Sequence, residues 1–455
     1  MKIKVENLGF ISSGEININN LTVIFGKNNV GKTYLSYATY GILREMRAAS
    51  SVTRLLKKSD MTKLKNEQLI EVDISKISPD HFIKEISKKF NKNLNTFFSA
   101  KEDFFKDSKV EAVTEFDFLK LKKIEISYNF QLDGIGLFVI KKNIDSDLLL
   151  ISLVPMNDEE GVFAKFDDDT MSIVTSSIIM DKFFKEVFEE VRSSFVITSE
   201  RTGVSLFYKE MDSYRSSLVN QIFKNSSGNI VTKKISKYST PISDNINTVR
   251  DYESLTKMKS KLFRNRRASK LINESLSNLL TGTFKHDEGE TVFIKQDDKG
   301  DVNIPISQSS SSIKSLFLLD LYARYVAEPG GFLIIDEPEL NLHPENQVKI
   351  AELLVRLVNF GIKIIMTTHS DYIIKEINNR VMLSNVKDKS NLYGMNFEKE
   401  DVISESKISA FTICDDGKIK EIEVSKYGIN NEIFDEVIYS MNDRNDLIFN
   451  ALSLE

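Results

Sequence analysis

Cysteine, tryptophan and histidine are scarce in this chain, and their scarcity excludes several kinds of site. The sequence has one cysteine (Cys414), no tryptophan and four histidines among 455 residues. A lone cysteine excludes an internal disulfide framework, and so few cysteines and histidines exclude a zinc site built from them. Such a composition is typical of a reducing compartment, so we expect a cytoplasmic protein.

Long apolar segments are missing too. The N-terminal stretch MKIKVENLGF lacks the apolar core of a signal peptide. No apolar run approaches the ~20 residues that a helix needs to cross a bilayer. The run LLLISLVP (148–155) has only the length of a strand. We therefore expect no contact with a membrane.

Neither sign of charge dominates the composition. The chain has 61 basic and 66 acidic side chains, and its formal net charge of −5 argues against a broad basic surface for nucleic acid. Hydrophobic residues make up 41% and charged residues 28%, as in ordinary globular proteins. A chain of this length forms two or three domain-sized units with a sizeable core.

A phosphate-binding loop follows the third predicted strand. The sequence GKNNVGKT fits G-x-x-x-x-G-K-[ST] and lies between the apolar run LTVIF and a helical pattern, as a P-loop should. Glycines let main-chain N–H groups surround phosphate oxygens beside a helix N-terminus. Lys32 would reach the β- and γ-phosphates of ATP, and the Thr33 hydroxyl would bind Mg²⁺. The predicted nucleotide ligands are Gly26, Lys27, Asn28, Asn29, Val30, Gly31, Lys32 and Thr33.

A second motif, GFLIIDEPELNLHP (331–344), aims carboxylates off the end of a buried strand. Because buried carboxylates need a cationic partner, we interpret Asp336 as a Walker B aspartate that meets the Mg²⁺ of the nucleotide. Glu337 then suits the general base that polarises the attacking water. The next apolar strand, in IMTTHS, ends at His369, which is either a γ-phosphate donor or switch, or a structural histidine.

Together these motifs resemble the ABC-type ATPase heads of SMC and DNA-repair proteins. DEPELNLHP and TTHSDYII are more similar to the overcoming-lysogenization-defect (OLD)-like ATPases of bacterial anti-phage systems, such as the ATPase subunits of the PARIS and Septu systems. FVITSERTG (195–203) and ISQSSSSIKSL (306–316) lie where such proteins carry a strand ending in arginine and a serine-rich signature. The resemblance covers about 1–45, 120–202 and 288–455.

The resemblance implies an α/β fold: a P-loop NTPase of the ABC type, with an antiparallel β subdomain and helical insertions. We expect a discontinuous head formed by 1–202 and 288–455, with a helical insertion at about 48–119. Residues 203–287 would form a helical arm that docks a partner. Two heads would pair head-to-tail, with ATP between the P-loop of one and the serines of the other.

Two positions depart from the ABC pattern. The signature lacks the glycines of L-S-G-G-Q, so Ser310, Ser311 and Ser312 would bind the γ-phosphate across the interface, unless they form only a serine-rich loop and a helix cap. No glutamine of a Q-loop follows the P-loop helix. Glu200 and Arg201 would replace it at the nucleotide, unless they form a structural salt bridge.

The remaining charged motifs bear on partners. KMKSKLFRNRRASK (Lys257–Lys270) holds seven Lys or Arg and is either a solvated helix face or a contact for a phosphate backbone or an acidic partner. The acidic stretches IDSD (144–147) and FDDDT (166–170) fit turns better than the Toprim nuclease site of OLD nucleases. We therefore expect a separate effector, which would be a nuclease.

These expectations converge on an Mg²⁺-dependent ATPase that uses ATP and Mg²⁺ as cofactors. Its predicted biological part is the sensor and motor subunit of a bacterial anti-phage system. Two alternatives stay open: a DNA-repair or chromosome-handling ATPase, and a nucleotide-gated scaffold with little turnover. The absence of a long heptad repeat counts against the first alternative.

Overall fold

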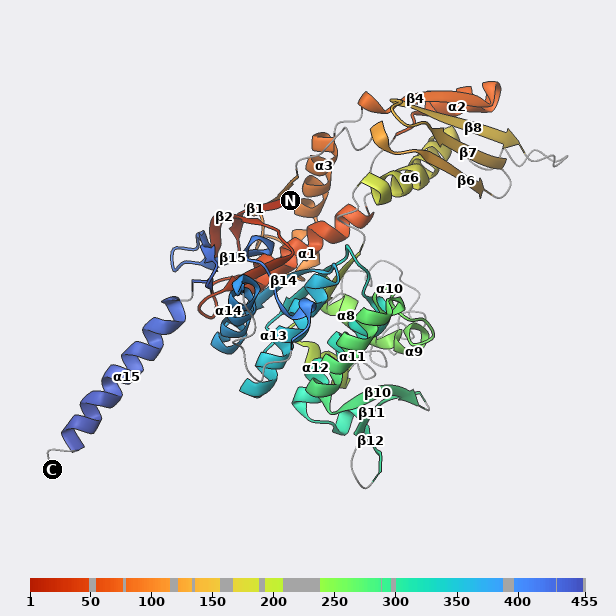
Figure 1. The fold of residues 1–455 in the computed structure, drawn as a ribbon. Helices are drawn as coiled ribbons and strands as arrows, with labels where there is room; N and C mark the ends of the chain where they lie inside the picture. Colours follow the sequence, from red (N-terminus) through yellow and green to blue (C-terminus); the bar gives the residue numbers. More distant parts are fainter. Residues whose placement is uncertain are drawn as a thin grey trace, which may run out of the picture. The chain divides into compact units, whose positions relative to one another are not determined.

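The computed structural model divides the chain into two compact units, which are described separately (Figure 1). The structure describes residues 1–48, 55–76, 79–114, 122–132, 136–155, 167–187, 193–207, 238–287, 289–295, 300–387, 397–430 and 432–452. Unit 1 comprises Met1–Lys2, Gly41–Lys92 and Glu111–Ser193, and unit 2 comprises Ile3–Tyr40, Asn93–Val110 and Ser194–Glu455.

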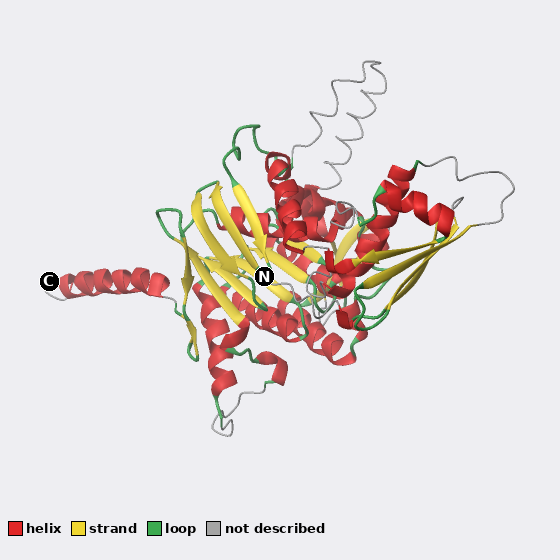
Figure 2. Cartoon of the chain, turned by 90° about the horizontal axis from the view of Figure 1, so that it is seen from above, coloured by secondary structure: helices red, strands yellow, loops and turns green. Residues whose placement is uncertain are grey.

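Unit 2 is built on a six-stranded sheet of order β16-β15-β3-β14-β13-β9, whose strands lie side by side in Figure 2. Its strands are β3 (Leu21–Phe25), β9 (Ser194–Ile197), β13 (Phe332–Asp336), β14 (Lys363–Thr368), β15 (Ile408–Ile413) and β16 (Ile419–Ile422). All neighbouring pairs are parallel except β15 with β16. The sequences LTVIF and FLIID are buried throughout, because a parallel sheet covered on both faces needs apolar side chains on both.

The register of this sheet brings three motif ends to one edge. Asp336 of β13 lies opposite Thr367 of β14, and Phe25 of β3 lies opposite Thr368. Parallel strands end at the same edge of a sheet, where ligands of α/β proteins bind. The residues that follow β3, β13 and β14 therefore meet there.

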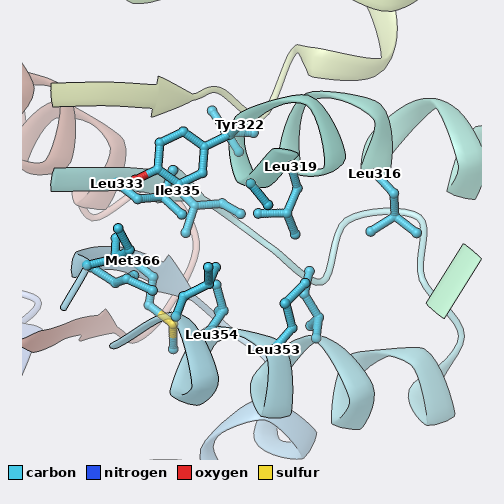
Figure 3. Packing of buried hydrophobic residues seen from close by; sticks show 14 of the residues in the cluster. Leu316, Leu319, Tyr322, Leu333, Ile335, Leu353, Leu354 and Met366 are labelled. Atoms are coloured by element: carbon cyan, nitrogen blue, oxygen red, sulfur yellow. The ribbon is translucent and has the colours of Figure 1, made fainter. Parts of the chain in front are cut away.

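Helices pack against this sheet around one hydrophobic core. Those that contribute to this core are α8 (Thr240–Arg250), α9 (Tyr252–Leu255), α10 (Lys261–Arg264), α11 (Arg266–Leu280), α12 (Ser311–Leu321), α13 (Pro344–Asn359) and α14 (Asp371–Asn385). Unit 2 also holds α1 (Lys32–Ala48, which starts in this unit), α4 (Leu94–Phe97) and α15 (Glu432–Leu452). A π-helical turn, Tyr322–Val326, extends α12. Figure 3 shows side chains of α12, β13, α13 and β14 packed together, with Leu319, Ile335 and Leu354 among them.

Smaller sheets and single turns complete unit 2. One sheet has the order β2-β1-β5, another β10-β11-β12, and β17 pairs with β18. Their strands are β1 (Lys2–Leu8, of which Lys2 is assigned to unit 1), β2 (Ile11–Asn17), β5 (Lys109–Val113, which starts in unit 2), β10 (Gly282–Asp287), β11 (Glu290–Lys295), β12 (Val302–Pro305), β17 (Val424–Ser425) and β18 (Gly428–Ile429). Short 3₁₀ turns lie at Ile306–Gln308, Lys399–Asp401 and Glu405–Lys407.

Unit 1 holds an antiparallel sheet of order β4-β8-β7-β6 with its own core. Its elements are α2 (Lys58–Glu67), β4 (Leu69–Asp73), a 3₁₀ turn (Ile74–Lys76), α3 (Pro79–Lys92), β6 (Ile126–Leu132), β7 (Gly136–Lys142), β8 (Leu148–Pro155) and α6 (Asp168–Val187). Alternate residues of the strands, such as Phe138 and Ile140, are buried with Met61 of α2 and Met171 of α6. The predicted meander is thus present, although its expected last strand, GVFAKF (161–166), lies outside the described residues.

Two expected boundaries differ from the structure. The tract 48–119 is not a helical insertion alone: it contributes β4, which pairs with β8 of the meander in the same compact unit. The described part of 203–287 is not a separate arm, because α8 and α11 bury Ile246, Val249 and Ile272 in the core of unit 2. Among the helices of the described residues, none combines the length and apolar character needed to cross a membrane.

Candidate active site

The P-loop follows β3 and relies on two glycines with positive φ. Gly26 has φ +133°, and a Cβ there would lie 2.9 Å from the Thr412 hydroxyl. Gly31 has φ +108°, and a Cβ there would lie 2.8 Å from Ile11. Larger residues would be strained in backbone and crowded in side chain at both positions. The loop can thus turn its N–H groups toward a phosphate at the start of α1.

Lys32 at the start of α1 is folded back onto this loop. Its Nζ donates to the carbonyl oxygens of Gly26 (2.9 Å) and Lys27 (2.6 Å), and only 6% of the residue is exposed. Burial lowers the pKa of Lys32, while the nearby carboxylates of Glu337 and Asp336 act to raise it. The two carbonyl oxygens therefore hold the Lys32 ammonium group at the loop, where a P-loop lysine contacts phosphate oxygens when a nucleotide binds.

A hydrogen bond to Asp336 connects the P-loop directly to the Walker B strand. The Thr33 hydroxyl donates to Asp336 Oδ2 at 3.0 Å, and the Thr367 hydroxyl donates to Oδ1. Asp336 is fully buried, and burial raises the pKa of its carboxyl group, although these two hydrogen bonds act to lower it. A hydroxyl and a carboxylate oxygen are hard ligands of the kind that Mg²⁺ takes beside a nucleotide.

Glu337 has a left-handed backbone, with φ +49°. For a residue with a side chain this conformation costs about 1–3 kcal/mol unless its surroundings hold it. Its N–H donates to the carbonyl oxygen (3.2 Å) and the hydroxyl (3.1 Å) of Thr367. The turn leaves the Glu337 side chain 25% exposed at the edge of the sheet.

His369 lies between two carboxylates at the end of β14. Its Nδ1 is 3.6 Å from Glu337 Oε1 and 3.4 Å from Glu339 Oε1. Glu339 Oε1 also accepts from the His369 main-chain N–H (2.8 Å) and the Thr368 hydroxyl (2.9 Å). Glu339 Oε2 is buried without a hydrogen-bond partner within the described residues. Sequence reasoning missed Glu339 as a site residue, although the spacing D-E-x-E placed it one residue beyond Pro338.

A comparison with protein-family models identifies the family to which these motifs belong. A family model described as an AAA ATPase domain matches residues 1–374, which include the P-loop, Asp336, Glu337 and His369. The chain belongs to the AAA ATPase domain family. The fold class expected from sequence, an α/β P-loop NTPase, is confirmed. No curated protein matches the chain.

Solved structures similar to this ATPase include SMC head domains. The Smc head domain of Pyrococcus furiosus with an extended coiled coil, bound to the C-terminal domain of ScpA, has 13% identity and a TM-score of 0.30, with 98% of both chains covered. A SmcHead bound to the C-winged helix domain of ScpA has 12% identity and a TM-score of 0.33, covering 93% of this chain and 98% of that one. The SMC head domain of Thermotoga maritima has 11% identity and a TM-score of 0.28, with the same coverage.

Arg201 of the ATPase is buried beneath the Walker B turn instead of facing a nucleotide. It is 1% exposed, and each of its three side-chain nitrogens donates to a main-chain carbonyl oxygen. The structure thus supports neither the expected replacement of the Q-loop glutamine nor a simple salt bridge. Glu200, its neighbour, is exposed and accepts from the Tyr37 hydroxyl at 3.3 Å.

The serine signature begins α12, as expected. Ser310 is the N-cap residue, and its hydroxyl accepts from the Ile313 N–H at 3.3 Å. Its hydroxyl also lies 2.9 Å from that of Ser312. Ser310 and Ser311 are exposed, and Ser312 is partly exposed. In the described part of the chain none of the three bonds to the P-loop of the same molecule, which leaves their binding role a prediction.

The basic stretch Lys257–Lys270 divides into paired and unpaired side chains. Lys261 pairs with Glu328 at 2.6 Å, and Arg267 pairs with Glu398 (3.0 Å) and Glu400 (2.6 Å). The four exposed cations without an ion pair within the described residues are Lys259, Arg264, Arg266 and Lys270. Arg267 is therefore part of the fold, contrary to its predicted use as a contact for a partner.

The acidic turns have structural partners. Asp145 has φ +59° in a turn, and Asp147 pairs with Lys122 at 2.8 Å. Asp167 accepts from the Thr170 N–H at 2.7 Å, at the start of α6. Among the described residues, no group of three or more His, Cys, Asp or Glu side chains is placed to hold a metal ion. Both turns therefore fit the structural interpretation.

Proposed function

We propose that the chain hydrolyses ATP with Mg²⁺ at the edge of the sheet where β3, β13 and β14 end. The observation that carries this proposal is the 3.0 Å hydrogen bond between Thr33 of the P-loop and the buried Asp336 of Walker B. It joins residues 303 positions apart into one candidate Mg²⁺ site. The folded-back Lys32 supplies a cation at the same edge.

Each residue would then have one part in hydrolysis. Thr33 and Asp336 would hold Mg²⁺, which neutralises charge on the transferred phosphoryl group when bound. Lys32 would exchange its two loop carbonyls for phosphate oxygens. Glu337 is partly exposed beside this site and would accept a proton from the attacking water. His369, which lies near Glu337, would donate to the γ-phosphate.

We propose further that two chains pair head-to-tail around ATP. The exposed serines at the start of α12 support this arrangement, because hydroxyls and N–H groups at the start of an 11-residue helix suit an anionic phosphate. Within one chain they do not bond to the P-loop, so a second copy would complete the site.

The biological part that we propose is that of sensor and motor in a bacterial anti-phage system, acting through a separate nuclease. The OLD-like motifs DEPELNLHP and TTHSDYII support it. So do the partners of Asp147 and Asp167, which fit structural parts for these acidic turns. The unpaired cations of Lys257–Lys270 would contact the phosphate backbone of a nucleic acid.

The test compares Lys32→Ala with the wild-type chain. We expect ATP affinity to fall by about 10–10²-fold, since hydrogen bonds to a charged group contribute about 1.5–3 kcal/mol each. Titration with a fluorescent ATP analogue measures the affinity, and phosphate release measures turnover. Lys142→Met is the control, because Lys142 is also buried and donates to carbonyls, but lies in unit 1. Unchanged affinity in Lys32→Ala, or a wild-type chain without turnover, would refute the proposal.

A further inference from the structure

Arg201 connects three parts of unit 2 that sequence keeps far apart. Its Nη1 donates to the carbonyl oxygens of Thr198 (3.2 Å) at the end of β9 and Asp336 (2.8 Å) in β13. Its Nη2 donates to the carbonyl oxygen of Glu337 at 2.6 Å. Its Nε donates to the carbonyl oxygen of Ser315 in α12 at 3.1 Å. One buried guanidinium group thus touches both Walker B acids and the serine helix.

Two residues close to Arg201 also contact α12 and the Walker B turn. Ser205 lies one turn further along the helical residues 201–207, and its single hydroxyl proton is shared between the carbonyl oxygens of Arg201 (2.8 Å) and of Lys314 in α12 (3.3 Å). The Thr202 hydroxyl accepts from the side-chain amide of Asn341, just after the Walker B turn, at 3.2 Å. The segment 201–207 is therefore bonded to α12 on one side and to the Walker B turn on the other.

The Walker B turn needs such support because Glu337 has a left-handed backbone, with φ +49°. Thr367 holds the peptide group on the N–H side of Glu337, and Arg201 holds its carbonyl oxygen. A planar guanidinium group with several fixed donors can hold two successive carbonyls, whereas an ammonium group on a flexible chain cannot fix their relative orientation. Arg201 thus determines the direction in which Glu337 leaves the strand.

We infer that Arg201 is a positioning residue that fixes the catalytic turn at Glu337 and makes its geometry depend on α12. This inference rests on the proposed function, in which the serines of α12 bind ATP held by a partner copy. A shift of α12 on binding would act on the Ser315 carbonyl and, through Arg201, on the Glu337 carbonyl. Coupling of this kind needs measured interaction energies, because contact alone does not establish it.

The decisive variant is Arg201→Lys, which keeps the charge but loses the planar donor group. We expect ATP affinity within about threefold of wild type and kcat about 10²-fold lower, since small misplacements of a catalytic group have effects of this size. Arg201→Met should be slower still, so that lysine rescues part of the rate. Arg356→Lys is the matched control: Arg356 is largely buried and pairs with Asp401, away from the Walker B turn, so its kcat should match wild type.

Thermal unfolding of Arg201→Lys and Arg201→Met shows whether a lower kcat comes from a less stable fold or from a misplaced Glu337. A kcat of Arg201→Lys within threefold of wild type would overturn the inference, and so would a loss of ATP affinity above tenfold, which would make Arg201 a nucleotide ligand. A wild-type chain without ATP turnover would instead overturn the proposed function itself.

Ser205→Ala decides the case if the Arg201 variants do not fold. It keeps Arg201 and removes one hydrogen bond to α12. We expect kcat to fall several-fold with ATP affinity unchanged, and a double-mutant cycle with Ser311→Ala to show non-additive effects on kcat. Wild-type kcat in Ser205→Ala, or strict additivity in the cycle, would show that α12 is not coupled to the catalytic turn.

Discussion

Two charged residues of the site are buried before any ligand binds. Asp336 is fully buried, which raises the pKa of its carboxyl group, and Lys32 is nearly so, which lowers the pKa of its amine. Burial disfavours the charged form of each group, so hydrogen bonds from hydroxyls and to loop carbonyls must support them. A metal ion and a phosphate supply stronger partners for the same two charges. The two residues are thus placed to bind a ligand that combines a metal cation with an anionic phosphate.

Glu337→Gln tests the general base at this scale. The amide preserves shape but cannot accept a proton, so we expect ATP and Mg²⁺ binding close to wild type and kcat lower by about 10²–10⁴-fold. Phosphate release at saturating ATP measures the rate. The variant should also accumulate as an ATP-locked assembly, seen as a larger species by light scattering. Turnover near wild type would assign the base to another residue.

Sequence patterns predicted the residues that would bind nucleotide and metal better than the residues that hold them in place. Lys32, Thr33 and Asp336 belong to contiguous motifs whose chemistry depends on spacing, and the structure brings them together. Arg201 was predicted at the nucleotide because it follows a strand end. Three of its four carbonyl partners lie more than a hundred residues away, and no local pattern records main-chain acceptors. Glu339 was overlooked although the spacing D-E-x-E placed it beside Glu337.

At the scale of elements, a short 3₁₀ turn fastens two helices. Arg267 at the start of α11 pairs with Glu398 and Glu400, and Arg356 near the end of α13 pairs with Asp401 at 2.5 Å. Glu400 is 5% exposed, and the hydrogen bond from Arg267 holds its pKa below the ordinary 4.5. This turn therefore fixes the position of α11, which carries two of the unpaired cations.

The basic stretch can be tested by separating its two kinds of side chain. Changing Lys259, Arg264, Arg266 and Lys270 together to glutamine should weaken binding of duplex DNA or RNA by tenfold or more. The log–log salt dependence should become less steep by about 0.9 per lost phosphate contact on DNA. Filter binding at several salt concentrations measures both, while basal ATPase activity stays at wild type. Unchanged binding would make the stretch a solvated helix face.

Arg267→Gln is the matched control for that experiment. It should keep nucleic-acid binding and lose only a little stability, because Arg267 is half exposed and its ion pairs are partly screened. The lowered pKa of Glu400 fixes the sign of the pH dependence. The pair stabilises the fold above the ordinary pKa and loses this effect as pH falls through the lowered one. Wild type and variant should thus converge in chemical unfolding once the pH lies below the lowered pKa of Glu400.

The element that sequence reasoning placed wrongly is β4. Its five residues, Leu69–Asp73, lie within a lysine-rich tract of helical pattern. Their strand conformation depends on pairing with Leu148–Pro155, some eighty residues later, because a strand of five residues has little stability alone. By contrast β3, β13 and β14 are apolar enough along their whole length to be recognised without their neighbours.

At the scale of the whole molecule, the proposed active site is shared between copies. A chain with Ser310, Ser311 and Ser312 replaced by bulky residues should bind ATP but not associate on binding it. Mixed in equal amounts with Lys32→Ala, it should recover at most about half of wild-type activity, since only mixed dimers close around ATP and each has one complete site of two. ATPase assays of the mixture, with each variant alone as control, measure this. No recovery would count against a composite site.

The division into two units was only partly predictable. The head and its order of motifs follow from the P-loop and Walker B sequences, whose strands belong to one parallel sheet. The boundaries at 41–92 and 111–193 depend on which strands pair, and the tract 238–287 joins the core through Tyr252, Leu276 and other buried side chains. Helical periodicity shows that a face is apolar but not which surface covers it.

The position of β14 between β3 and β13 has a consequence for a newly made chain. The P-loop leaves the ribosome early, but β3 pairs with β14, whose last residue follows Thr33 by more than three hundred positions. At about 5–20 residues per second, roughly 20–70 s separate the synthesis of these two segments. Until then the loop has no neighbour on that side and no Asp336 at its threonine. The candidate site is thus incomplete in an unfinished chain, which lacks the strand between β3 and β13.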